Sequence, residues 1–120
     1  MGKSNLLGAW GEALAANYLE KKRYRLVAQG FRCRFGEIDL IAQKGKTLCF
    51  VEVKTRSNLQ YGLPREYVTA AKQEKLRKTA AFYLSQQELD CPVRFDVAEV
   101  YTDEQHNAAS VRIEYLENAF

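Results

Sequence analysis

The stretch GEIDLIAQKGKTLCFVEVKTR, residues 36–56, contains two runs of alternating side chains separated by the turn sequence QKGK. β-Branched and aromatic residues in such alternation are typical of β-strands, and a short glycine-containing loop between two strands is typical of a hairpin. The sequence therefore predicts two antiparallel strands, at residues 36–43 and 47–56.

The segments on either side extend this hairpin into an α/β arrangement. An Ala- and Leu-rich stretch predicts a helix that begins near Asn5, a candidate N-cap, and ends near residue 22. A second helix is predicted where apolar residues recur at helical spacing. This second helix is predicted at 66–89, and the further predicted elements are strands at 24–35, 93–101 and 110–116. The order αβββαββ predicts an α/β sheet with helices packed on it.

Length and composition indicate one domain over residues 1–120, since 47% of the residues are apolar and 28% are charged. The formal charge of +3 permits a polyanionic partner without requiring one. Three widely spaced cysteines outside any CxxC pair indicate reduced thiols in a cytoplasmic protein, and no apolar run has membrane-spanning length. The single histidine, His106, lies in a polar loop, which argues against histidine-dependent nucleases and zinc hydrolases.

Acidic side chains share one face on both predicted hairpin strands. Glu52 and Lys54 alternate with valines that we expect to face the core, and Glu37 and Asp39 alternate in the same way on the preceding strand. A two-residue loop at residues 44–45 would place Asp39 opposite Phe50 and diagonal to Glu52. The two acids would then lie close enough for one ion to bridge them.

The types of side chain in this cluster predict a chemistry. Asp39, Glu52 and Glu37 would repel one another unless a cation neutralised them, and their hard oxygen atoms suit Mg²⁺ or Mn²⁺. Lys54 beside them could orient an attacking water and stabilise charge that develops on a phosphate. The pattern therefore favours metal-assisted cleavage of phosphodiesters.

Glu12 is a further candidate, because helical geometry places it on a stripe of small and apolar residues suited to packing against a sheet. The stripe consists of Gly8, Ala15, Ala16 and Leu19. A carboxylate on such a stripe needs a partner. Gly8 and Gly11 each cost about 1 kcal/mol relative to alanine within a helix, which indicates that the backbone approaches another element closely.

Basic residues flank the acidic cluster in the sequence and are candidates for binding nucleic-acid phosphates. They are Arg32, Arg34, Arg56, Lys72 and Lys75. Lys72 is favoured because it lies on a helical stripe with Leu76 and Thr79, at the edge of the buried face. For Lys75 a solvated helix surface is an equal alternative.

Four ordered motifs carry a resemblance to a known family. GEIDLI at 36–41 followed by FVEVKTR at 50–56 resembles the core of the PD(D/E)XK nuclease superfamily, and more closely the archaeal Holliday junction resolvases. With GxxGE, formed by Gly8, Gly11 and Glu12, and RFDV at 94–97, nearly the whole chain is similar to the YraN family of predicted endonuclease-like proteins.

The resemblance implies a restriction-endonuclease-like fold with a mixed central sheet. It implies that Glu12, Asp39 and Glu52 bind Mg²⁺ or Mn²⁺, that Lys54 is the catalytic lysine, and that the substrate is DNA, with RNA not excluded. Branched and single-stranded DNA are the candidate forms. Likeness to junction resolvases further implies a homodimer, because a two-fold protein can place two active sites on a two-fold substrate.

Three alternatives stay open at this point. The chain could be an inactive domain that binds nucleic acid or recruits a partner on a nuclease fold, or a structural module that uses the helix at 66–89 as its contact surface. Glu52 and Lys54 could be only a solvated polar pair.

The roles of two further acids also stay open. Glu37 could equally be an acid that supports the metal ligands or a solvated residue near a turn. Asp96 is more often structural, with a hydrogen bond to Arg94 or to a helix end.

Overall fold

The computed structural model describes residues 3–56, 68–103 and 110–120. The order of elements is αβββαββ, as predicted. The elements are α1 (Lys3–Lys21), β1 (Arg25–Cys33), β2 (Gly36–Lys44), β3 (Thr47–Arg56), α2 (Ala70–Gln86), β4 (Val93–Tyr101) and β5 (Arg112–Leu116). His106 and the first two residues of the helix predicted at 66–89 lie outside the described residues.

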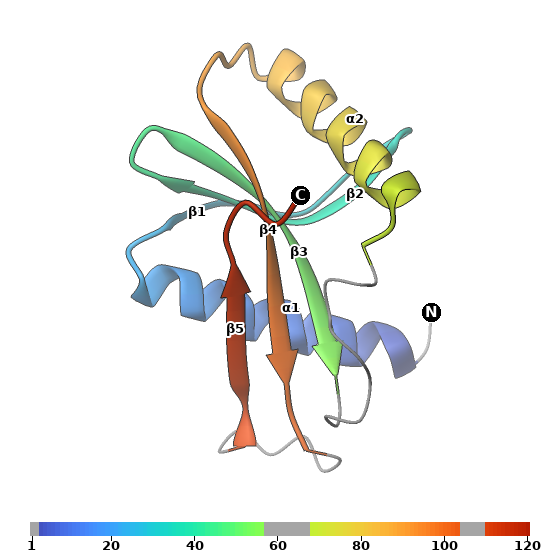
Figure 1. Cartoon of the computed structure of the whole chain (residues 1–120), viewed down its shortest axis with the longest axis vertical. Coiled ribbons are helices and arrows are strands. Elements are labelled where there is room, and N and C mark those ends of the chain that lie inside the picture. The colour runs from blue at the N-terminus through green and yellow to red at the C-terminus, as the bar shows by residue number, and fades with distance from the viewer. Residues whose placement is uncertain (1–2, 57–67, 104–109) are drawn as a thin grey trace.

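A five-stranded mixed sheet forms the centre of the fold, with the strands in the order β1-β2-β3-β4-β5. The pairs β1–β2, β2–β3 and β4–β5 are antiparallel, whereas β3 and β4 run parallel. Parallel neighbours need a crossover connection, and α2 belongs to the one that joins β3 to β4 (Figure 1). The α/β fold with a mixed sheet is therefore confirmed, and it is consistent with a restriction-endonuclease-like architecture.

The two helices cover opposite faces of the sheet (Figure 1). On the α1 side Ala15 and Leu19 pack against Leu40 and Val51. On the α2 side Phe50 packs with a second cluster that contains Leu76, Tyr83 and Val97. The expectation that the valine face of β3 is a core face is confirmed. The Phe50 face is buried as well, because β3 is a central strand with a helix over each face.

Both helices differ from their predicted bounds at their ends. Asn5 lies inside α1, which begins at Lys3, so Asn5 is not the N-cap. The first residue of α2 is Ala70, because the Thr69 side chain accepts a hydrogen bond from the backbone N–H of Lys72 and caps the helix there. At the other end Gln87 is the C-cap and Glu88 has a positive φ of 54°, which ends the helix before residue 89. Among the described residues no helix is long and apolar enough to cross a membrane.

Candidate nuclease-like site

A split between β2 and β3 creates the candidate site. The two strands pair from Lys44↔Thr47 as far as Leu40↔Val51, beyond which β2 continues to Gly36 while pairing with β1. Just beyond the last pair, the Asp39 Oδ2 atom accepts a hydrogen bond from the backbone N–H of Val53 at 2.8 Å. A carboxylate thus takes the place of a main-chain acceptor where the strands part.

The predicted hairpin register is wrong by two residues. Phe50 lies opposite Ile41 instead of Asp39, because the two-residue loop consists of Gly45 and Lys46. Gly45 adopts a φ of +60°, a conformation that glycine accepts readily at such a turn. A shift of two residues preserves the alternation of faces, and Asp39 and Glu52 still line one pocket. Ile38 is an exception, because it packs with Ile41 on the α2 side and not with Leu40 and Ala42. Beyond Leu40↔Val51 the strands part, and Asp39 and Glu52 line the same pocket, where the charge of Glu52 acts on Asp39.

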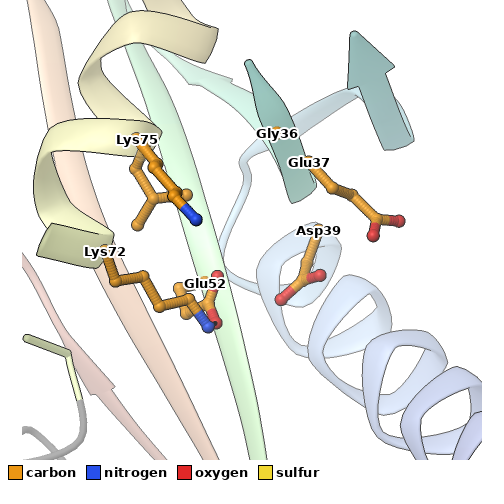
Figure 2. Close-up of a pocket in the computed structure, with 7 residues that line it drawn as sticks. Gly36, Glu37, Asp39, Glu52, Lys72 and Lys75 are labelled. Atoms are coloured by element: carbon orange, nitrogen blue, oxygen red, sulfur yellow. Dashed lines mark ion pairs between the residues drawn. The ribbon is translucent and has the colours of Figure 1, made fainter. Parts of the chain in front are cut away.

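Glu52 is a buried carboxylate held by two lysines. Its Oε2 atom lies 3.4 Å from Lys54 Nζ, two residues along the same strand, and 2.5 Å from Lys72 Nζ, which reaches down from the first turn of α2. Figure 2 shows the Lys72 side chain extending from the helix to Glu52. The Glu52 side chain is only 7% exposed, so both ion pairs are shielded from bulk water.

Glu12 reaches the same site from the opposite layer. Gly11 lies so close to β3 that an added Cβ would overlap the side chain of Thr55, which fixes this turn of α1 against the sheet. Glu12 is half-buried, and its pKa is raised by burial and by the charge of Glu37, although a hydrogen bond with Asp39 opposes the shift. The predicted approach of Glu12 to Asp39 therefore occurs in the structure. Gly8 plays no such part, since a Cβ there would meet nothing within 4 Å.

The pKa of Asp39 is strongly raised by its surroundings. Burial raises its pKa to about 7, and the negative charges of Glu52, Glu12 and Glu37 contribute in the same direction. The hydrogen bond from Val53 only partly offsets them. Four acidic side chains from α1, β2 and β3 are thus close enough to influence one another, and a bound cation would relieve their repulsion.

A pocket of about 210 Å³ opens beside these acids, between α2 and the split strands (Figure 2). Residues of both charges line it together with one glycine and one leucine. They are Gly36, Glu37, Asp39, Glu52, Lys72, Lys75 and Leu76. Burial lowers the pKa of Lys54, which favours a neutral amine compared with an ordinary lysine. Burial also acts to lower the pKa of Lys72, but its hydrogen bond to Glu52 and the charge of Glu52 outweigh this effect and raise it.

The predicted phosphate-binding residues differ in their relation to the pocket. Lys72 and Lys75 line the pocket, but Arg32, Arg34 and Arg56 are not among the lining residues. Arg32 is exposed and lies 3.5 Å from Glu37, which connects it to the rim of the acidic cluster. Arg34 is exposed and lies over the ring of Phe35. Arg56 is half-buried, and its charge acts on Glu99.

Asp96 is part of a structural network on the α1 side of the sheet. Its carboxylate accepts hydrogen bonds from the Arg94 guanidinium, from the Tyr115 hydroxyl at 2.5 Å and from the backbone N–H of Asn118 at 2.8 Å. The side chain is fully buried. The hydrogen bond between Asp96 and Arg94 that the sequence suggested is therefore present.

Glu99 was missed by sequence reasoning. It is fully buried on β4 beside Lys54, its partner in the parallel ladder, and burial raises its pKa to about 6. Because Glu99 lies two residues after Val97, it shares the α2-facing side of β4. This position would have predicted a second acid beside Lys54 only if the pairing of β3 with β4 had been known.

The donor set fits a hard divalent cation chemically. The carboxylates of Glu12, Asp39 and Glu52 supply only oxygen ligands, and neighbouring carboxylates add to the effect of burial in raising the pKa of Asp39. Among the described residues no group of three or more His, Cys, Asp or Glu side chains has the spacing of a preassembled metal cluster. Mg²⁺ commonly uses one or two carboxylates and completes its shell with waters and substrate oxygens, so the two observations are compatible.

Comparison with known proteins identifies the family of this chain. Residues 11–100 match the uncharacterised protein family UPF0102. A UPF0102 protein of Geobacter metallireducens is 46% identical over 95% of this chain and 91% of its own length. UPF0102 proteins of Alkaliphilus metalliredigens and Caldicellulosiruptor saccharolyticus are 44% and 40% identical, over 98% and 95% of this chain and 99% and 96% of their own lengths. The chain belongs to the UPF0102 family, a YraN-like family, so the resemblance seen in the sequence is confirmed at that level.

Proposed function

We propose that this protein is a metal-dependent endonuclease that hydrolyses phosphodiester bonds in DNA. The observation that carries the proposal is the convergence of Glu12, Asp39 and Glu52 from three elements beside a pocket that Lys72 and Lys75 also line. Acids and lysines around one pocket suit a substrate that is itself anionic and binds together with a cation.

Glu12, Asp39 and Glu52 are the residues that would hold Mg²⁺ or Mn²⁺. When bound, such an ion would polarise the scissile phosphate and lower the pKa of a coordinated water. Asp39 is held by the Val53 N–H and Glu52 by Lys54, so these carboxylates are already oriented. Preorganised groups avoid the cost of reorganisation during the reaction.

Lys54 is the group best placed to act on the reacting atoms. Its side chain is 16% exposed, and its lowered pKa makes proton exchange with water easier than for an ordinary lysine. It could therefore orient an attacking water, accept its proton, or donate a hydrogen bond to charge that develops on the phosphate. Lys75 and Arg32, at the pocket and its rim, would attract the flanking phosphates.

A second candidate function is a binding domain without nuclease activity. The observation that favours it is the 2.5 Å ion pair between Lys72 and Glu52, which satisfies one of the acids without a metal. Such a domain would bind nucleic acid through the same pocket, and its acids would serve to orient lysines. Both candidates are compatible with a homodimer on a two-fold DNA substrate.

Cleavage assays separate the two candidates. The purified protein is incubated with labelled single-stranded, duplex, flapped and four-way DNA, and with an RNA of matched sequence, in Mg²⁺, Mn²⁺ or EDTA. We expect cleavage that requires the metal and is lost in both Asp39→Ala and Lys54→Ala, with circular dichroism showing that each variant folds. Binding without cleavage under every condition would instead establish the second candidate.

A further inference from the structure

Lys72 contacts the acidic cluster through Glu52 and also lines the pocket. Its Nζ atom pairs with Glu52 Oε2, the oxygen that also faces Lys54, yet its side chain is 40% exposed and lines the pocket. Lys54 is far less exposed, at 16%, and reaches Glu52 along its own strand. Of the two lysines on this oxygen, Lys72 is the one that also lines the pocket.

The backbone of Lys72 is fixed while its long side chain is not. The Lys72 N–H donates to the Thr69 side chain at 3.1 Å, which anchors the first turn of α2. Four methylene groups separate this anchor from the ammonium, so rotation about the side-chain bonds can carry the charge from Glu52 towards the pocket. Breaking the Lys72–Glu52 contact therefore requires no movement of the helix.

We propose that Lys72 couples metal binding to phosphate binding by exchanging partners. In the absence of nucleic acid its ammonium neutralises Glu52 and competes with a divalent cation for that carboxylate. A phosphate that enters the pocket draws the ammonium away and leaves Glu52 available to the cation. This inference rests on the proposed function, because it requires that Glu52 bind the metal and that the pocket accept a phosphate.

The partner exchange predicts that metal binding and phosphate binding strengthen each other. If phosphate binding strengthens metal binding through Lys72, then the metal must strengthen phosphate binding by the same factor. Lys75 supplies the matched control, since it lines the same pocket from the same helix but makes no ion pair with any residue in the described part of the chain. Neutralising Lys75 lowers the positive charge of the pocket without releasing Glu52.

Two measurements on the full chain test the coupling. The affinity for Mn²⁺ alone is measured by electron paramagnetic resonance for the wild type, Lys72→Gln and Lys75→Gln. The affinity for a labelled DNA oligonucleotide is then measured by fluorescence anisotropy with and without Mn²⁺. We expect Mn²⁺ to strengthen DNA binding about tenfold in the wild type and in Lys75→Gln. In Lys72→Gln the effect should be clearly smaller, because only direct contact between the ion and the phosphate remains. Lys72→Gln should also bind Mn²⁺ alone more tightly than either of the other two.

The contrary outcomes are distinguishable. Equal Mn²⁺ affinity in all three proteins, with the coupling intact in Lys72→Gln, would overturn the partner exchange and leave the proposed metal site standing. Failure of all three proteins to bind Mn²⁺, with or without DNA, would overturn both the exchange and the proposed metal-dependent function.

Discussion

The carboxylate of Asp39 accepts a hydrogen bond from the backbone N–H of Val53 at 2.8 Å, at the point where β2 leaves β3. The separation of β2 from β3 therefore also positions Asp39 in the site. The strand pairing that ends at Leu40↔Val51 frees a main-chain donor, and the side chain that satisfies it is brought beside Glu52.

Replacing Asp39 should stabilise the protein at alkaline pH. Its pKa is about 7 in the folded chain, against about 3.9 in an unfolded one, so folding favours the protonated form. The stability that protonated Asp39 contributes is complete below pH 4 and is lost as the pH rises to 7. In EDTA, Asp39→Asn should raise the free energy of unfolding by about 2 kcal/mol at pH 8 and change it little at pH 4. Urea unfolding at the two pH values checks this, and equal effects at both would contradict it.

Gly11 and Gly8 should respond oppositely to the same substitution. Gly11→Ala forces a Cβ into the Thr55 side chain and should destabilise the protein by about 2 kcal/mol, whereas Gly8→Ala meets open space and should stabilise α1 by about 0.5–1 kcal/mol. Thermal unfolding of the two variants measures both effects. Similar changes in the same direction would mean that α1 does not pack on β3 at Gly11.

Asp96 should matter for stability and not for cleavage. Asp96→Asn leaves the Arg94 guanidinium with only the exposed Glu117 as a charge partner and should cost about 3 kcal/mol. Glu117→Gln is the control, because the Glu117 side chain is 62% exposed and lies 3.7 Å from the same guanidinium, so it should cost under about 1 kcal/mol. Any metal-dependent cleavage should persist in folded Asp96→Asn at moderate temperature, and its selective loss would assign Asp96 to the reaction.

Lys75 should contribute to nucleic-acid binding through charge alone. Lys75→Ala should weaken DNA binding for every sequence and lower the slope of log K against log salt by about one, since one phosphate contact is lost. Lys46→Ala, in the loop at the opposite end of the β2–β3 pairing, should leave that slope unchanged. Salt titrations of binding compare the two, and equal effects would place the DNA elsewhere.

The sequence predicted the order of the elements and the face on which the acids lie, because both depend on local periodicity. The two-residue error in the hairpin register did no harm to the site, since strand side chains repeat with a period of two. The contact of Lys72 with Glu52 could not be predicted in this way. It depends on how α2 docks over Phe50 through Leu76 and Tyr83, and helical periodicity shows only that those residues face a core.

Glu99 illustrates the same limit. Along β4 it reads as one polar residue in an alternating strand, and its relation to Lys54 appears only once β3 and β4 are known to pair in parallel. Glu12 was predictable because the stripe around it lies within a single helix. Local patterns therefore located Glu12, Asp39 and Glu52. The contact of Lys72 and the position of Glu99 depend on non-local packing and strand pairing, so only the structure could show them.

The most direct test of the account is to locate a bound Mn²⁺ by its paramagnetic effect on the amide signals of the ¹⁵N-labelled protein. Substoichiometric Mn²⁺ should broaden the signals of Glu52, Val53 and Asp39 first, while that of Asn118, in the Asp96 network, persists longer, and Asp39→Asn should abolish this selectivity. Uniform weak broadening, or broadening centred on another part of the chain, would contradict the claim that Glu12, Asp39 and Glu52 form a metal site.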